Sequence, residues 1–265
     1  MLFAQVFGEK HLFGTGFLLF VVSLFLILLQ KSKTNLKQQQ QFYLYLFTGL
    51  FLVIEIFRLI FLFIRDGGLA IYQLPLNLCS VPLYLYPAIS LDKKNGQLKK
   101  WLMPAAFATV MLAGLIALLI PTNILGPEMF WLPIDKNYVE IASFTYHAVM
   151  IAAPLALIKL NYYQPKLRDV SYALLFTGGF AAVAMTVNAL LNQDFLLLNY
   201  GNGSPFQFLI TESKLLYQAT MIGLGALLIS LFFVFANLGK LKSPFRRMNK
   251  TVMFSQTAHR NKTEK

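Results

Sequence analysis

Long apolar runs separated by short polar connectors dominate the chain. A run of about 20 apolar residues is long enough to cross the hydrocarbon core of a bilayer as a helix. The apolar runs cover residues of about 12–30, 42–64, 69–90, 101–120, 139–159, 170–191 and 216–238. The pattern therefore predicts an all-α membrane protein, with a bundle of seven transmembrane helices in residues 1–239 and a basic tail in residues 240–265.

Composition and charge agree with this prediction. Hydrophobic residues make up 57% of the chain, charged residues only 13%, and the mean hydropathy is +0.60, which excludes a soluble domain. The net charge is +12, but 18 of the 23 Lys and Arg residues lie in the connectors 31–41, 92–100 and 159–168 and in the tail. By the positive-inside rule, the N-terminus is outside and the C-terminus is cytoplasmic. We expect a multi-pass protein of the cell membrane whose partners are membrane lipids and not nucleic acid.

The third run, LAIYQLPLNLCSVPLYLYPAIS, differs from the others because it holds three prolines and the only cysteine of the chain. Read as one helix, it places a set of polar and proline residues on a single face. These residues are Tyr72, Pro75, Cys79, Pro82 and Tyr86. Each proline removes a backbone hydrogen bond, and a carbonyl freed in this way is tolerated in a membrane only beside protein or an aqueous cavity. The run therefore predicts an interior helix beside a cavity, with Cys79 near mid-depth.

Ionisable residues inside the predicted spans give a second indication of a site. Glu55 and Arg58 are three residues apart in the second span, and His147 lies in the fifth. Such groups are costly in a bilayer unless they are paired or wetted, so Glu55 and Arg58 form either a structural ion pair or part of a site. Counted from the outer ends of the spans, Cys79 is roughly 15 Å deep, His147 roughly 12 Å, Glu55 roughly 13 Å and Arg58 roughly 9 Å. We expect one polar layer in the outer half of the membrane.

The residue types in this layer limit its chemistry. A buried cysteine is inert, but an imidazole that takes its proton converts it to a nucleophilic thiolate. Cys79 and His147 are the only such pair inside the spans, because His11 and His259 lie near the termini. No second histidine or carboxylate cluster predicts a metal site, and we expect no cofactor.

Four short sequences resemble a known family. They are LPLNLC in the third run, GLIALLIP at the end of the fourth, the F-x-x-H of Phe144–His147 in the fifth, and NQDFLLL from Asn192, followed by GSPF. Over about residues 10–240, they resemble the YwaF-like integral membrane proteins, a family related to eukaryotic transmembrane protein 164. The resemblance implies that a relative acts as a phospholipid acyltransferase with a cysteine as acyl carrier and a histidine as base. Cys79 and His147 stand at the matching positions.

Two functional hypotheses follow. The first is transfer of a lipid acyl chain through a Cys79 thioester in an outer-half polar cavity, with His147 as base and later acid. The candidate substrate-binding residues are Glu55, Arg58, Asn77, Ser143, Asn188 and Asn192. The second is a non-catalytic lipid or solute binder, a sensor or a transporter. Long inverted repeats would favour transport, and the sequence contains no convincing repeat.

Overall fold

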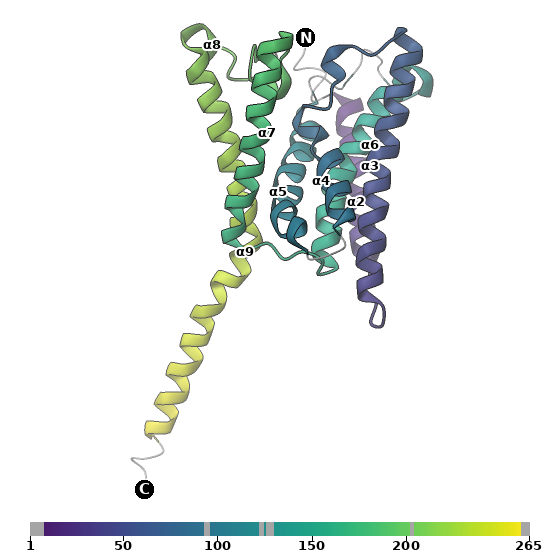
Figure 1. Ribbon diagram of the computed structural model, residues 1–265. Coiled ribbons are helices and arrows are strands. Elements are labelled where there is room, and N and C mark those ends of the chain that lie inside the picture. The colour runs from purple at the N-terminus through teal and green to yellow at the C-terminus, as the bar shows by residue number, and fades with distance from the viewer. Residues whose placement is uncertain (1–7, 93–95, 122–124, 126–129, 202–203, 261–265) are drawn as a thin grey trace.

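Helices that run side by side along one direction form the protein (Figure 1). The structure is a computed structural model that describes residues 8–92, 96–121, 125, 130–201 and 204–260, with side chains described as far as residue 238. Helices are the only regular elements in these residues. The α-helices are α2 (Glu9–Leu28), α3 (Leu36–Asp66), α4 (Pro82–Leu91), α5 (Gln97–Leu119), α6 (Ile134–Lys159), α7 (Val170–Leu191), α8 (Leu209–Glu212) and α9 (Lys214–Arg260). Four single 3₁₀ turns join them: η1 (Ile71–Gln73), η2 (Leu78–Ser80), η3 (Leu167–Asp169) and η4 (Phe195–Leu197).

Six of the described helices are long and apolar enough to cross a membrane, against the seven predicted. They are α2, α3, α5, α6, α7 extended by η3, and α9 as far as Leu238. The third predicted span is different, because only Leu78–Leu91 forms a shorter apolar helical segment. The chain between α3 and α5 still passes from one end of the bundle to the other (Figure 1). A short helix and two 3₁₀ turns therefore replace the predicted full-length helix.

The prolines explain this break. Pro82 is the first residue of α4, where a missing N–H costs nothing, so the helix begins there. The carbonyl of Ile71, four residues before Pro75, accepts from Leu74 N at 3.0 Å, and that of Leu78 accepts from Val81 N at 3.3 Å. These are 3₁₀-type bonds, so the freed carbonyls find partners in the backbone and not in a cavity. The prediction that Tyr72, Pro75, Cys79, Pro82 and Tyr86 share one helical face is wrong.

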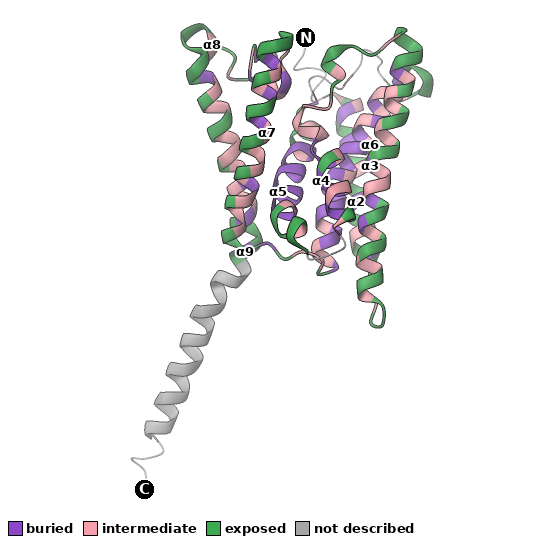
Figure 2. Cartoon of the chain, in the orientation of Figure 1, coloured by how far each residue is buried: buried purple, intermediate pink, exposed green. Residues whose placement is uncertain are grey.

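Two central helices, α5 and α6, carry most of the core. Both are largely buried, whereas few residues of α2, α3, α7 and α9 as far as Leu238 are buried (Figure 2). Small residues allow α5 and α6 to pack closely, and a Cβ at Gly114 would lie only 2.9 Å from the backbone oxygen of His147. α6 also packs against α2 and α3, while α5 packs against α4, α7 and α9. The site residues on α6 are therefore held between helices on three sides.

The exposed faces of the outer helices are apolar. Phe13 and Phe20 on α2 are 69% and 64% exposed, and Ile64 on α3 and Leu190 on α7 are each 76% exposed. In water, so much exposed apolar surface is unfavourable, and in a bilayer it meets lipid tails. The exposure pattern therefore supports a multi-pass membrane protein.

The two ends of the bundle differ in charge. The starts of α2 and α6 meet at one end, where Lys10 Nζ lies 2.6 Å from Glu140 Oε2 and 2.9 Å from Asn137 Oδ1. At the opposite end, Gln40 Nε2 at the start of α3 donates to the carbonyl of Leu160 after α6 at 2.7 Å. That opposite end carries the basic connectors 31–41 and 159–168. The two basic connectors 31–41 and 159–168 therefore lie at the same end of the helices.

Candidate functional site

A two-point ion pair on α3 marks the polar layer. Arg58 Nε donates to Glu55 Oε2 at 2.9 Å, and Arg58 Nη2 donates to Glu55 Oε1 at 2.7 Å. Both side chains are mostly enclosed, with 23% and 15% of their surface exposed for Arg58 and Glu55. The parallel N–H donors of a guanidinium match the two oxygens of a carboxylate, so each charge is compensated locally. The pairing that the i, i+3 spacing suggested is confirmed.

Cys79 lies in η2, in the broken stretch before α4, and not on a continuous helix. Its side chain is half-buried and packs against the main apolar core. Both Glu55 and Arg58 act electrostatically on the thiol. The structure therefore brings the cysteine and the ion pair, 21 or more residues apart in sequence, into one neighbourhood.

His147 is buried on α6, one helical turn from Ser143. Its Nδ1 donates to the backbone oxygen of Ser143 at 2.7 Å, and Ser143 Oγ lies 3.4 Å from the same nitrogen. A neutral imidazole that donates from Nδ1 keeps its lone pair on Nε2. The charges of Glu55 and Arg58 also act on this ring. His147 is thus oriented by its own helix with Nε2 as the basic atom.

Cys79 and His147 share the ion pair as a neighbour but are not hydrogen-bonded to each other in the described residues. In the described part of the chain, no hydrogen bond joins the thiol to either ring nitrogen. Catalytic hydrogen bonds are often formed only when substrate is bound. The arrangement places a thiol and an imidazole near one charged pair, with no hydrogen bond between the thiol and the imidazole.

Two of the predicted asparagines hold a turn beside the broken segment. Asn188 Oδ1 accepts from Phe195 N at 2.7 Å, and Asn188 Nδ2 donates to Phe195 O at 2.9 Å. Asn77 Oδ1 accepts from Leu196 N at 3.3 Å. Leu196 and Leu197 have φ of 59° and 57°, a left-handed conformation that is unfavourable for leucine. The asparagines thus stabilise a strained turn. One of them, Asn77, is two residues before Cys79 in the sequence, so the turn lies next to the broken segment.

The third candidate asparagine, Asn192, lies elsewhere. It is exposed and ends α7 in a left-handed conformation with φ of 53°, and its Oδ1 accepts from the Tyr200 hydroxyl. Asparagine tolerates this conformation better than most residues, so its local role is to end the helix. The structure does not bring Asn192 into the group around Glu55 and Arg58.

Sequence reasoning missed Tyr146. This residue on α6 is only 6% exposed, and Cys79, Glu55 and Arg58 all act electrostatically on its hydroxyl. The signal was present, because Tyr146 is one of the two variable positions in the F-x-x-H sequence that drew attention to His147. It was missed because a tyrosine in an apolar span is usually an ordinary packing residue.

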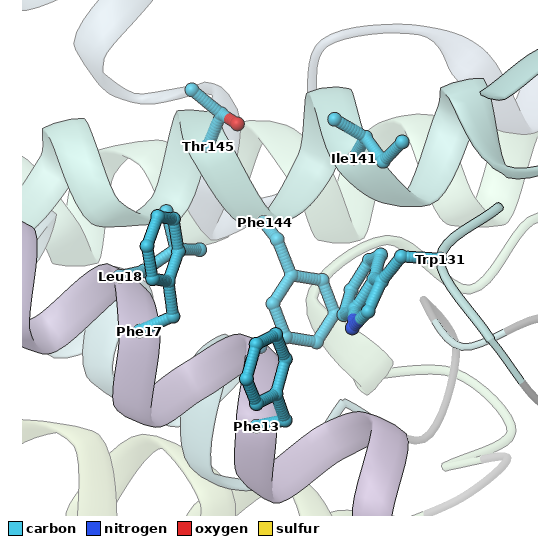
Figure 3. A pocket seen from close by; sticks show the side chains of 8 residues that line it. Phe13, Phe17, Leu18, Trp131, Ile141, Phe144 and Thr145 are labelled. Atoms are coloured by element: carbon cyan, nitrogen blue, oxygen red, sulfur yellow. The ribbon is translucent and has the colours of Figure 1, made fainter.

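An apolar groove of about 270 Å³ lies on another side of α6 (Figure 3). Its lining residues are Phe13, Gly14, Phe17, Leu18, Trp131, Ile141, Phe144 and Thr145. Trp131 packs directly on Gly14, where a Cβ would fall 2.3 Å from the indole, and Trp131 Nε1 donates to Lys10 O at 3.1 Å. Tyr146, by contrast, faces α3 and packs against Phe51 with ring centroids 5.3 Å apart. The groove and the polar group are therefore on different sides of the helix.

The residues around the polar group do not form a metal centre. Among the described residues, no three His, Cys, Asp or Glu side chains are close enough together to hold a metal ion. The chemistry available here is that of a thiol, an imidazole, a phenol, a serine hydroxyl and an ion pair.

Comparison with known proteins gives one match. A family model described as the TMEM164 family matches residues 6–249. No curated protein and no solved structure matches the chain. The match covers the helical bundle and both residues, Cys79 and His147, around which the polar group is built. The chain therefore belongs to the TMEM164 family.

Proposed function

We propose that this membrane protein is a lipid acyltransferase that carries the acyl group as a thioester on Cys79. The observation that carries the proposal is the common neighbourhood of Cys79, His147 and the Glu55–Arg58 pair. A buried thiol needs a base to become a thiolate, and His147 is the base that this site offers, while Glu55 keeps the positive charge of Arg58 from being buried alone. The apolar surroundings suit an acyl tail, and the membrane supplies the substrate.

The first half-reaction forms the thioester. His147 Nε2 takes the thiol proton, and Cys79 Sγ attacks the carbonyl carbon of a lipid ester. A C–S bond forms, the ester C–O bond breaks, and the leaving alkoxide receives the proton from the imidazolium. The contact between Sγ and Nε2 that this transfer needs is made in the substrate complex.

The second half-reaction passes the acyl group on. The hydroxyl of an acceptor lipid gives its proton to Nε2 and attacks the thioester carbon. A new C–O bond forms, the C–S bond breaks, and the thiolate takes the proton back from His147. No oxidant, reductant or metal is needed, and the protein returns to its starting state.

Label transfer to Cys79 tests the proposal. Purified protein is incubated in vesicles with a phospholipid that carries a radiolabelled acyl chain, and the denatured protein is treated with neutral hydroxylamine, which cleaves thioesters. We expect hydroxylamine-sensitive label on the wild type and none on Cys79→Ala. His147→Ala should slow labelling about a hundredfold or more, because a nucleophile and its base act as one unit. Ser230→Ala serves as the control and should label normally, because the Ser230 hydroxyl donates to the carbonyl of Ala226 within its own helix α9.

A second function is favoured by the missing contact between Cys79 and His147. A non-catalytic lipid binder needs no such contact, and the groove beside Phe144 offers an apolar surface for an acyl chain. In that case the wild type would acquire no covalent label, and Cys79→Ala would bind lipid as the wild type does. The same experiment therefore decides between the two functions.

A further inference from the structure

The connector between α7 and α9 contains two adjacent leucines in an unfavourable backbone conformation. Leu196 and Leu197 have φ of 59° and 57°, which brings the Cβ of each leucine close to the following carbonyl oxygen. Glycine adopts this conformation freely, but two leucines in succession keep it only where the surrounding structure holds them there. Backbone strain of this kind is concentrated at functional sites, so the turn requires an explanation.

Side chains from α7 and α9 fix the strained turn. Asn188 on α7 is 3% exposed, and it binds the backbone of Phe195 at 2.7 Å through Oδ1 and at 2.9 Å through Nδ2. From α9, the Tyr217 hydroxyl donates to the carbonyl of Leu197 at 2.6 Å. These bonds offset the strain, and they make the turn a fixed part of the α7–α9 pair.

One N–H of the turn leaves the connector. Leu197 N donates to the Asp194 carbonyl at 3.1 Å, inside the connector, whereas Leu196 N donates to Asn77 Oδ1 at 3.3 Å. Asn77 belongs to the broken segment before α4 and stands 119 positions earlier in the sequence. The left-handed conformation therefore directs one backbone donor away from its own loop and onto the segment that contains Cys79.

The turn around Cys79 begins at Asn77. The Asn77 carbonyl accepts from Ser80 N at 2.9 Å, which closes η2 around the cysteine. Asn77 is also the N-cap of η2, but its side chain makes no capping bond to that turn and accepts from Leu196. η2 has three residues, follows the non-helical stretch 74–77 and packs against α4 and α5. Such a short turn depends on contacts outside itself, and Asn77 supplies the one to the α7–α9 pair.

We infer that Asn77 and Asn188 are positioning residues for Cys79 and do not bind the substrate. Asn188 sets the strained turn, the turn presents Leu196 N, and Asn77 ties the cysteine turn to it. A displacement of about 1 Å at a reacting group can lower a rate about a hundredfold, so the position of the thiol decides the rate. The catalytic part of this inference rests on the proposed acyltransferase function.

The test measures two reactions of the same thiol. Cys79 is the only cysteine, so its alkylation by N-ethylmaleimide in detergent reports on the position of the thiol without any acyl transfer. Asn77→Ala removes the acceptor for Leu196 N. We expect kcat for acyl labelling to fall about tenfold to a hundredfold, with KM for the phospholipid unchanged. Alkylation should become faster, because the freed turn opens more often.

Two further variants complete the test. Asn77→Asp keeps an oxygen acceptor in a side chain of the same shape, so it should restore both kcat and the alkylation rate. Asn161→Gly removes a side-chain acceptor at the opposite end of the bundle, where Asn161 is exposed, has φ of 59° and accepts from Gln164. Glycine suits that conformation, so Asn161→Gly should leave both rates unchanged. Thermal unfolding in detergent checks that each variant is folded.

The other outcomes are also decisive. If Asn77→Ala raises KM and keeps kcat, Asn77 contacts the substrate and the inference is overturned. Unchanged kcat and alkylation rates, or rates that Asn77→Asp does not restore, overturn it as well. A wild-type protein that acquires no acyl label overturns the proposed function alone. In that case the alkylation rates of Asn77→Ala and Asn77→Asp still decide whether Asn77 holds the cysteine turn.

Discussion

Glu55 and Arg58 lie one helical turn apart on α3 and bind each other through two hydrogen bonds of 2.7 and 2.9 Å. The pair does more than compensate its own charges, because it is the common electrostatic neighbour of Cys79, Tyr146 and His147. These three residues come from two segments that are more than 60 residues apart. The ion pair thereby connects the broken segment before α4 with the central helix α6.

Replacing one residue of the Glu55–Arg58 ion pair should destabilise the protein more than replacing both residues. Glu55→Gln or Arg58→Gln leaves one enclosed charge without its partner, which should cost about 3 kcal/mol of unfolding free energy. The double variant should lose less than the two single losses added together. Unfolding in mixed micelles measures all three values. Strict additivity in this cycle would show that the two residues do not stabilise each other.

Enlarging Gly114 should displace His147. A Cβ at this position would lie 2.9 Å from the His147 backbone oxygen and 3.0 Å from Met150 Cβ, so α5 and α6 must move apart. We expect Gly114→Ala to cost about 1–3 kcal/mol and to reduce labelling of Cys79. The matched control is Gly178→Ala on α7, where nothing lies within 4 Å of the new methyl group. Equal thermal midpoints for the two variants would contradict the close packing of α5 on α6.

Asn188 should be required for the turn that contains Leu196. Asn188→Ala leaves the buried N–H and carbonyl of Phe195 without their side-chain partner, which should cost about 1–3 kcal/mol. Asn192→Gly is the comparison, because glycine adopts the left-handed conformation freely and should cost much less. Thermal unfolding in detergent measures both. If the two variants unfold at the same temperature, Asn188 does not hold the turn.

The charge asymmetry predicts the orientation in the membrane. Cysteines introduced in a Cys79→Ala background at Lys33 and Lys166, which are exposed at the basic end, should be protected from a membrane-impermeant maleimide in intact cells. A cysteine at Lys136, exposed at the start of α6, should react. All three should react after the cells are lysed, which controls for accessibility. The opposite labelling pattern would place the N-terminus in the cytoplasm.

The sequence by itself determined the features that depend on neighbouring residues. Apolar runs of about 20 residues predicted the six long helices, because each residue there satisfies its backbone within the helix and its side chain in lipid. The i, i+3 spacing of Glu55 and Arg58 predicted their ion pair, since both ends of that contact lie on one helical turn. Cys79 and His147 were singled out by residue type and by the resemblance of their motifs.

The tertiary structure decided what depends on distant parts of the chain. Pro87, Pro104 and Pro154 lie inside continuous helices, whereas the stretch around Pro75 and Pro82 is broken into 3₁₀ turns. A proline always removes one backbone hydrogen bond, but packing decides whether the helix continues past it. The same holds for partners brought together across the sequence, such as Lys10 with Glu140 and Asn77 with Leu196. The packing of the Tyr146 ring on Phe51 belongs with these, because it exists only once α6 has packed against α3.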